Sequence, residues 1–200
     1  MEQFISLVNN NQDTTIRRAC CILEIMRSLY LLLMTLMWPV MLMAATGFPG
    51  ISGKTLNNQP INLPNNQHHQ LIILGFDQQS GELMEAWVRG LQLMVPTPPI
   101  DWVQVPVIGG VPPFVDGLIK RGMEKSIPKE IQGRFFPYFG NKKWDILKSI
   151  HGSETLADNA TPFIVITAPN GQIRLAKQFN ASSANITVVL NSIRDLYAND

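Results

Sequence analysis

Residues 161–177 read TPFIVITAPNGQIRLAK, and this stretch decides the fold. The apolar run at 163–166 is rich in β-branched residues and is typical of a buried strand. Asn170-Gly171 is a strong signal for a tight turn between two strands. Residues 172–177 then alternate apolar and polar side chains, as a half-buried strand does. The sequence therefore predicts a β-hairpin, with Gly171 as a structural residue of its turn.

Upstream of this hairpin, the pattern predicts a strand, a helix and a second strand. Residues 71–76 form a continuous apolar run, which favours a central strand buried on both faces. Ser80 is placed to cap the following helix, as a structural residue. The next strand is expected at 102–108, near a sheet edge or at a bulge, because Pro106 has no N–H for a ladder.

Helical spacing and a second turn signal account for most of the rest. An N-terminal hairpin is expected at 54–63, and a short helix at 144–150. A final helix starts at Ser182 or Ser183 and turns an apolar face to the core. Residues 114–139 have an interrupted helical pattern. Its first half carries an apolar stripe formed by Phe114, Val115, Leu118, Ile119 and Met123.

The order of these elements is hairpin, strand, helix, strand, broken helix, strand, turn, strand and helix. Two strands joined by a crossover helix pair in parallel with a right-handed connection, and the last hairpin adds an antiparallel edge. This arrangement resembles the thioredoxin fold, with the extra N-terminal hairpin of peroxiredoxins, over residues 48–198. The expected fold class is α/β, with a central mixed sheet flanked by helices.

Within that superfamily, the chain resembles mitochondrial ATP-synthase assembly factors with a peroxiredoxin-like domain. The shared features are the helix bearing Trp87, the strand ending VPVI at 105–108, and the strand–turn–strand at 163–175. The chain also resembles exported bacterial thioredoxin-like proteins. The resemblance places Thr161-Pro162 where the fold has a cis-proline before a strand. It therefore implies a cis bond at Pro162 and a structural role for this residue.

The N-terminal part is typical of a targeting segment. Residues 29–43 form a 15-residue apolar run without charge, preceded by Arg27 and followed by small residues at 44–47. This is the pattern of a secretory signal peptide. We expect residues 26–45 to be a signal peptide or a retained signal anchor.

A segment such as residues 1–25 is unusual in front of a signal peptide. Met26 is therefore the expected start, and residues 1–25 are an upstream extension that need not be translated. Residues 46–200 would form the thioredoxin-like domain, exported to the periplasm or anchored in the inner membrane. The mitochondrial resemblance makes the mitochondrial inner membrane the alternative location.

Composition excludes several function classes. The chain carries 16 Lys and Arg against 15 Asp and Glu, so it lacks the basic excess of a generic nucleic-acid binder. Adjacent His68 and His69 would point to opposite faces of a strand and seldom ligate one metal together. No metal site, cofactor or catalytic residue is expected.

The positions of the two cysteines exclude thiol chemistry in the domain expected at 46–200. Thioredoxin-type redox chemistry needs a thiolate at the start of the first helix. The corresponding stretch, residues 77–82, reads DQQSGE. Cys20 and Cys21 both precede the leader, and residues 46–200 contain no cysteine. The domain is thus not expected to be a thiol enzyme.

Ser80 has a rival interpretation as a hydrolytic nucleophile. It would need a general base held by a third group, and His151 with Asp145 or Asp158 could be proposed. The flanks of Ser80 lack the Gly-x-Ser-x-Gly elbow, so a helix cap is the favoured interpretation.

Aromatic residues supply the candidate docking surface. Phe135 and Phe139 are expected to lie on one face of the broken helix and to pack in the core of the domain. Phe136 or Tyr138 is expected to be partly exposed, where it could contact a partner. Trp102 could extend that surface, and the strand at 172–177 offers a second docking place by strand addition.

The basic residues of the middle segment are expected on a solvated helix face, with contact to anionic lipid as the alternative. They are Lys120, Arg121, Lys125, Lys129 and Arg134.

The function expected from these observations is non-catalytic. The domain would act by contact with a protein partner, of unknown identity, in assembly of a membrane or envelope complex. The alternative is a small-ligand carrier or a cysteine-independent enzyme that uses the thioredoxin active-site corner.

Overall fold

A four-stranded mixed sheet lies at the centre of the domain, in the order β4-β3-β5-β6. Its strands are β3 (Gln70–Gly75), β4 (Asp101–Pro106), β5 (Phe163–Thr167) and β6 (Ile173–Gln178). β3 pairs in parallel with β4 and antiparallel with β5, and β5 pairs antiparallel with β6. Ile72 lies opposite both Val103 and Val165. The sheet confirms the α/β thioredoxin-like arrangement that the element order predicts.

The computed structural model describes residues 47–151 and 158–198. The expected upstream extension at 1–25 and the leader at 26–45 lie outside these residues. In the described ranges, no helix combines the length and apolar character needed to cross a bilayer.

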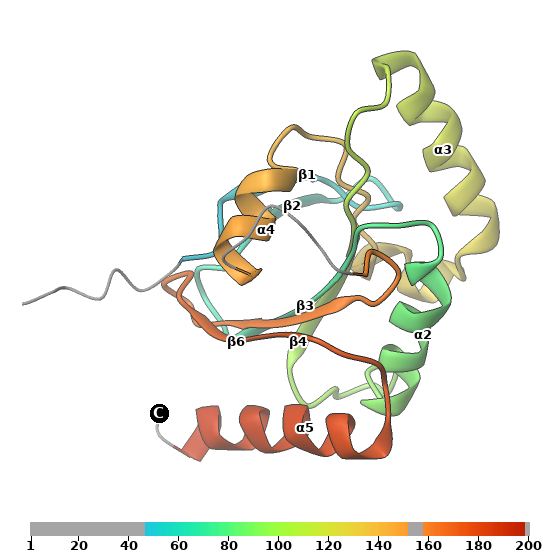
Figure 1. Cartoon of the computed structure of the whole chain (residues 1–200). Helices are drawn as coiled ribbons and strands as arrows, with labels where there is room; N and C mark the ends of the chain where they lie inside the picture. Colours follow the sequence, from blue (N-terminus) through green and yellow to red (C-terminus); the bar gives the residue numbers. More distant parts are fainter. Residues whose placement is uncertain (1–46, 152–157, 199–200) are drawn as a thin grey trace, which may run out of the picture. The chain divides into compact units, whose positions relative to one another are not determined.

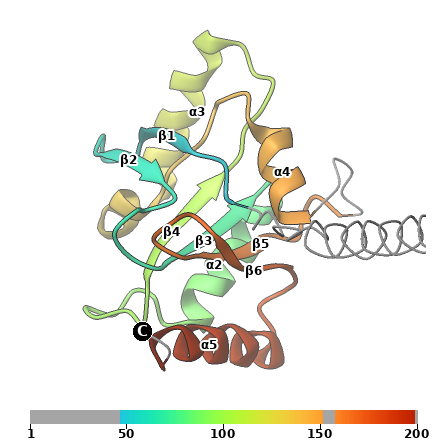
Figure 2. The same cartoon turned by 90° about the vertical axis from the view of Figure 1, so that its left-hand side faces the viewer.

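Helices cover both faces of the sheet (Figures 1 and 2). α2 (Ser80–Gly90) and α5 (Ser183–Ala198) pack on one face, against Leu71, Ile73 and Ile164. On the other face lie α4 (Lys143–His151) and the hairpin of β1 (Ile51–Lys54) and β2 (Pro60–Leu63), which pack against Ile72, Leu74 and Val165. Because successive strand residues point to opposite faces, one apolar run serves both cores.

Both predicted turns form. β1 and β2 pair antiparallel, and Asn58 in their turn has φ 65. Gly171 has φ 78, a left-handed conformation that glycine adopts without steric cost. The Gly171 N–H donates to the Ala168 carbonyl at 2.8 Å and closes the β5–β6 turn. The expected N-terminal hairpin is therefore confirmed, and Gly171 lies in the turn between β5 and β6.

The aromatic segment is not the helix that the sequence analysis expected. α3 (Pro113–Ser126) is followed by the 3-10 helix η1 (Lys129–Arg134), and the chain then becomes extended beside β4. Phe136 N donates to Gln104 O at 2.8 Å, and Tyr138 N donates to Pro106 O at 2.9 Å. Pro137 falls between these donors, so its missing N–H costs no bond. The segment covers the outer edge of β4, which would otherwise present unpaired backbone groups.

The prediction of a cis bond at Pro162 is wrong. Among the described residues the cis peptide bond is Leu63-Pro64, and Thr161-Pro162 is trans. Trans is the intrinsic preference of an X-Pro bond, with only about 5–6% of such bonds being cis in folded proteins. Pro162 still directly precedes β5.

Candidate functional site

The thioredoxin corner is the turn from β3 into α2, and its backbone is held by one aspartate. Asp77 Oδ1 accepts a hydrogen bond from Gln79 N at 2.8 Å. The Asp77 carbonyl accepts two more, from Ser80 N at 3.2 Å and from the Ser80 hydroxyl at 2.6 Å. Asp77, Gln78 and Gln79 are exposed, whereas Ser80 is 1% exposed. The corner therefore exposes the polar residues 77–79, and the buried Ser80 lies beneath them.

Ser80 is not the N-cap that its sequence position suggested. The N-cap of α2 is Gln79, which makes no side-chain capping bond. The Ser80 hydroxyl turns inward instead, where it contacts the Met84 sulfur at 3.8 Å as well as Asp77 O. Asp77, three residues upstream, organises this turn. Aspartate readily accepts a bond from the backbone two residues on, a signal that the capping interpretation overlooked.

Gly75 makes this inward turn possible. A Cβ atom at Gly75 would lie 2.2 Å from Ser80 Oγ and 2.5 Å from Met84 Sδ. Both distances are far below van der Waals contact, so only glycine lets α2 approach the end of β3 this closely. A lone glycine at the end of an otherwise apolar run, 71–74, is a recognisable sign of such an approach.

In the part of the chain that the structure describes, the Ser80 hydroxyl bonds to Asp77 O and Met84 Sδ, and no hydrogen bond joins it to His151, Asp145 or Asp158. The His151 ring packs against Phe163, with ring centroids 5.8 Å apart, at the end of α4. Asp158 binds locally: its carboxylate accepts hydrogen bonds from the Thr161 hydroxyl and from Ala160 N. These bonds, with Thr161 as the largest cause, lower the pKa of Asp158 below its ordinary value. The described residues include no cluster of three histidine, cysteine or acidic side chains suited to a metal ion.

Two hollows in the described surface lie away from the corner. One, of about 410 Å³, is lined by Gln70, Asp101, Trp102 and Arg134, with Arg134 ion-paired to Asp101. Gln70 and Asp101 begin β3 and β4, so this hollow is at the amino ends of the parallel strands. In α/β sheets ligands bind outside the carboxyl ends, where this protein has the closed corner. Neither of these two hollows therefore supports the ligand-carrier alternative at that corner.

The three residues expected to bind a partner are buried. Trp102, Phe136 and Tyr138 are all at most 7% exposed. In the extended segment beside β4, Phe136 and Tyr138 point to the same face of the sheet and join the core there. The Phe136 ring also lies against Gly53 of β1. The expectation that these side chains form an exposed docking surface is therefore wrong.

Two other surfaces are less covered. β6 ends the sheet order and pairs only with β5 among the named strands, with Arg174 and Lys177 exposed. Just before β6, Gly47 forms a bridge with Gln172, and Phe48 N donates to Gly171 O at 2.9 Å. α3 presents Phe114 and Leu118 to solvent, although the sequence analysis placed both in an apolar stripe. The signal that could have found this is the spacing: Arg121 and Lys125 share their side of the helix.

Comparison with known proteins identifies the fold. No family model matches the chain, and no curated protein matches it. The structure resembles a SCO1/SenC family lipoprotein from Bacillus anthracis, with TM-score 0.51 and 13% identity, covering 76% of this chain and 95% of that one. It also resembles BsSco, a member of the Sco family of cytochrome c oxidase assembly proteins. There the TM-score is 0.50 at 9% identity, and 74% and 92% of the two chains are covered.

At such identities the likeness concerns architecture alone. Together with the strand order and the N-terminal hairpin, it shows that this protein has the thioredoxin-like fold.

Proposed function

We propose that this protein is a thioredoxin-like module that works without a thiol, by contact with a protein partner, while exported or tethered to a membrane. One observation carries the proposal: the corner where thioredoxin chemistry takes place is closed by a buried serine. Ser80 takes its hydroxyl inward to Asp77, and residues 46–200 contain no cysteine. A fold retained without its reactive group is suited to recognition.

The edge of β6 is the docking place that we favour for a protein partner. An edge strand offers unpaired backbone N–H and C=O groups to an extended peptide. Exposed Arg174 and Lys177 on this strand would favour an acidic segment. On the other side of the sheet, the edge of β4 is already occupied by residues 135–138.

The finer assignment also belongs to this proposal. The helix bearing Trp87 and the strand–turn–strand at 163–175 support kinship with mitochondrial ATP-synthase assembly factors or with exported bacterial thioredoxin-like proteins. BsSco, which shares the architecture, belongs to a family of cytochrome c oxidase assembly proteins. An assembly role at a membrane is the function that these analogies suggest, with the apolar run at 29–43 as anchor or leader.

Affinity capture from cross-linked membranes tests the proposal. The full chain would be compared with Cys20→Ser/Cys21→Ser and with the edge variant Arg174→Glu/Lys177→Glu. We expect one partner, identified by mass spectrometry, to be captured equally by the first two chains and lost with the third. Capture that requires the cysteines would indicate a mixed disulfide and contradict a contact-only function. Undiminished capture by the edge variant would remove β6 as the docking place.

A further inference from the structure

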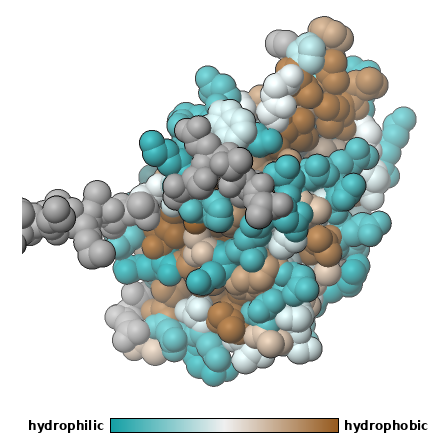
Figure 3. All heavy atoms as spheres, in the orientation of Figure 1, coloured by the Kyte–Doolittle hydropathy of each residue, from teal (hydrophilic) through white to brown (hydrophobic). Residues whose placement is uncertain are grey.

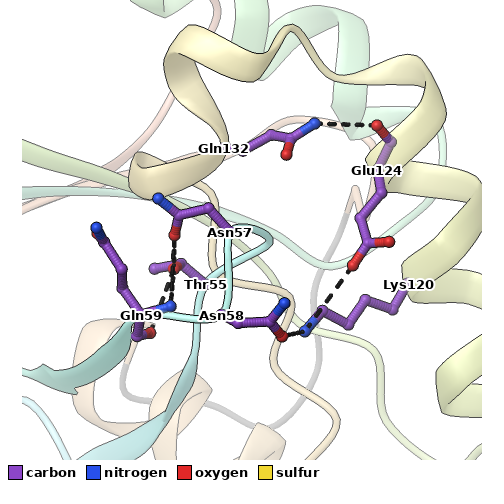
Figure 4. A network of polar contacts seen from close by, with 7 residues as sticks. All are labelled: Thr55, Asn57, Asn58, Gln59, Lys120, Glu124 and Gln132. Carbon is purple, nitrogen blue, oxygen red and sulfur yellow. Dashed lines mark hydrogen bonds and ion pairs between the residues drawn. The ribbon is translucent and has the colours of Figure 1, made fainter.

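α3 stands apart from both cores of the domain. Of the α3 residues whose side chains the structure describes, 114–126, none belongs to either apolar cluster or is among the partly buried residues packed against one. Polar contacts join it to the rest of the domain, in addition to the half-buried Val115, Ile119 and Met123 on its inner side (Figure 4). Lys120 donates to Asn58 of the β1–β2 turn at 2.7 Å, and the Gln132 amide donates to Glu124 O at 2.9 Å. The apolar side chains on the outward side of α3 therefore take no part in packing the domain.

The outward face of α3 is apolar and basic. Its exposed positions recur at helical spacing and contain no acid: Phe114, Gly117, Leu118, Arg121, Gly122, Lys125 and Ser126. Phe114 is 84% exposed and Leu118 is 70% exposed. Figure 3 shows apolar side chains gathered where α3 lies in Figure 1. Both acids of the helix are half-buried: Asp116 lies on its other side, and Glu124 lies at the flank of the outward face, where it pairs with Lys120.

A second amphipathic position, at the start of α4, is linked to α3 through the loop that precedes that helix. Trp144, at the start of α4, is 53% exposed, and Lys143 Nζ lies 5.5 Å from its ring centroid. The Lys143 side chain also lies against Gly109, in the loop that leads into α3. Lys142 donates to Gly50 O at 2.6 Å, which places this point beside the first strand of the domain. Tryptophan and lysine together are the side chains favoured at a membrane interface.

The charge on the outward face of α3 indicates what kind of molecule binds there. In a symmetric dimer the same patch meets itself, so Arg121 and Lys125 would face their own copies and repel. A complementary surface offers an apolar layer to Phe114 and Leu118 and anionic groups to Arg121 and Lys125. The acyl chains and headgroups of an anionic bilayer have this arrangement. The sequence places the apolar run at 29–43 only three residues before Gly47. Three residues span at most about 11 Å, so a retained anchor would hold the domain at the bilayer surface.

We infer that the outward face of α3, with Trp144, rests on an anionic lipid surface. Phe114 and Leu118 enter the interface, and Arg121 and Lys125 bind lipid phosphates. This inference rests on the proposed membrane tether. One such face gives only weak binding by itself, but the tether makes the contact intramolecular. The contact would orient the domain so that the edge of β6 is presented in a fixed direction.

A depth-sensitive probe on α3 tests the inference in the full chain. Gly117→Cys in a Cys20→Ser/Cys21→Ser background would carry an NBD dye, since a side chain at Gly117 meets open space. The control dye sits at Val188→Cys on α5, an exposed position on the opposite end of the domain from α3 in both views (Figures 1 and 2). Each chain is reconstituted in phosphatidylcholine vesicles with and without phosphatidylglycerol.

We expect the α3 dye to shift to the blue only on vesicles with phosphatidylglycerol, while the α5 dye does not respond. Each basic residue near an anionic surface contributes about fivefold to binding. Arg121→Gln/Lys125→Gln should therefore weaken the contact about 30-fold, and added salt should do the same. Phe114→Ser/Leu118→Ser should abolish the shift. The matched variant Met94→Ser/Val95→Ser, also at exposed apolar positions, should leave it intact.

The outcomes separate the inference from the proposed tether. If the chain fails to float with neutral vesicles, the tether is refuted. If it floats but the α3 dye reports water on anionic vesicles, the lipid contact is refuted while the tether stands. A blue shift on neutral vesicles that grows with protein density would identify a second copy of the chain as the occupant and overturn the inference.

Discussion

The hydroxyl of Ser80 donates a hydrogen bond of 2.6 Å to the carbonyl oxygen of Asp77. This bond places the first side chain of α2 beneath the corner, not on its rim. A group in that position is shielded from solvent by the turn that carries it. The corner is therefore closed by its own geometry as well as lacking a thiol.

Cysteine substitutions at neighbouring positions measure this closure. In a Cys20→Ser/Cys21→Ser background, Gln79→Cys should react readily with a thiol reagent, because Gln79 is exposed at the helix N-terminus. Ser80→Cys should react only as fast as α2 opens locally. Equal reaction rates for the two thiols would show that the corner is open.

Gly75 and Gly81 form a matched pair for stability. Gly75→Ala would force its Cβ to 2.2 Å from Ser80 Oγ and should lower the free energy of unfolding by about 1–3 kcal/mol. Gly81→Ala, with open space around its Cβ, should raise it by about 0.5–1 kcal/mol. Urea denaturation of both variants checks the signs. A neutral Gly75→Ala would mean that α2 does not press on β3.

The aromatic residues of 135–138 should behave as core. Phe136→Ala should cost about 3–5 kcal/mol, the usual range for a buried phenylalanine. Phe114→Ala, at an exposed position, should change stability by no more than about 0.5 kcal/mol. Thermal unfolding of the two variants decides the matter. Similar losses at both sites would contradict the exposure described for α3.

The carboxylate of Asp158 should titrate below the ordinary range of an aspartate. Hydrogen bonds from Thr161 and then from Ala160 N favour its charged form. A lowered pKa contributes stability that is present above the unfolded value and lost as the pH falls through the folded one. Thr161→Val should move the pKa of Asp158 back toward its ordinary value, as an NMR titration would show. An unchanged midpoint would assign the shift to another group.

The strands and their order followed from local patterns in the sequence. Residues 71–76 and 163–166 are continuous apolar runs, and such runs have few solutions other than strands buried on both faces. Asn170-Gly171 fixed a turn for the same reason, because its backbone conformation is local. These signals do not depend on contacts with distant parts of the chain.

The parts that failed depend on distant contacts. Residues 135–138 are extended because their N–H groups find carbonyl partners at Gln104 and Pro106, more than 30 positions away in the sequence. Ser80 faces inward because Gly75 leaves it room. The exposure of Phe114 and Leu118 reflects the absence of these residues from both cores. The spacing of apolar residues within one segment does not reveal such contacts with distant residues.

Insulin-disulfide reduction by the full chain tests most directly the claim that this protein works without thiol chemistry. The chain retains Cys20 and Cys21, so the assay gives thiol activity every opportunity to appear. We predict turnover no greater than that of buffer with the same reductant, beside an active thioredoxin as the positive control. Turnover above buffer that disappears in Cys20→Ser/Cys21→Ser would contradict the account, because the chain would then be a thiol oxidoreductase.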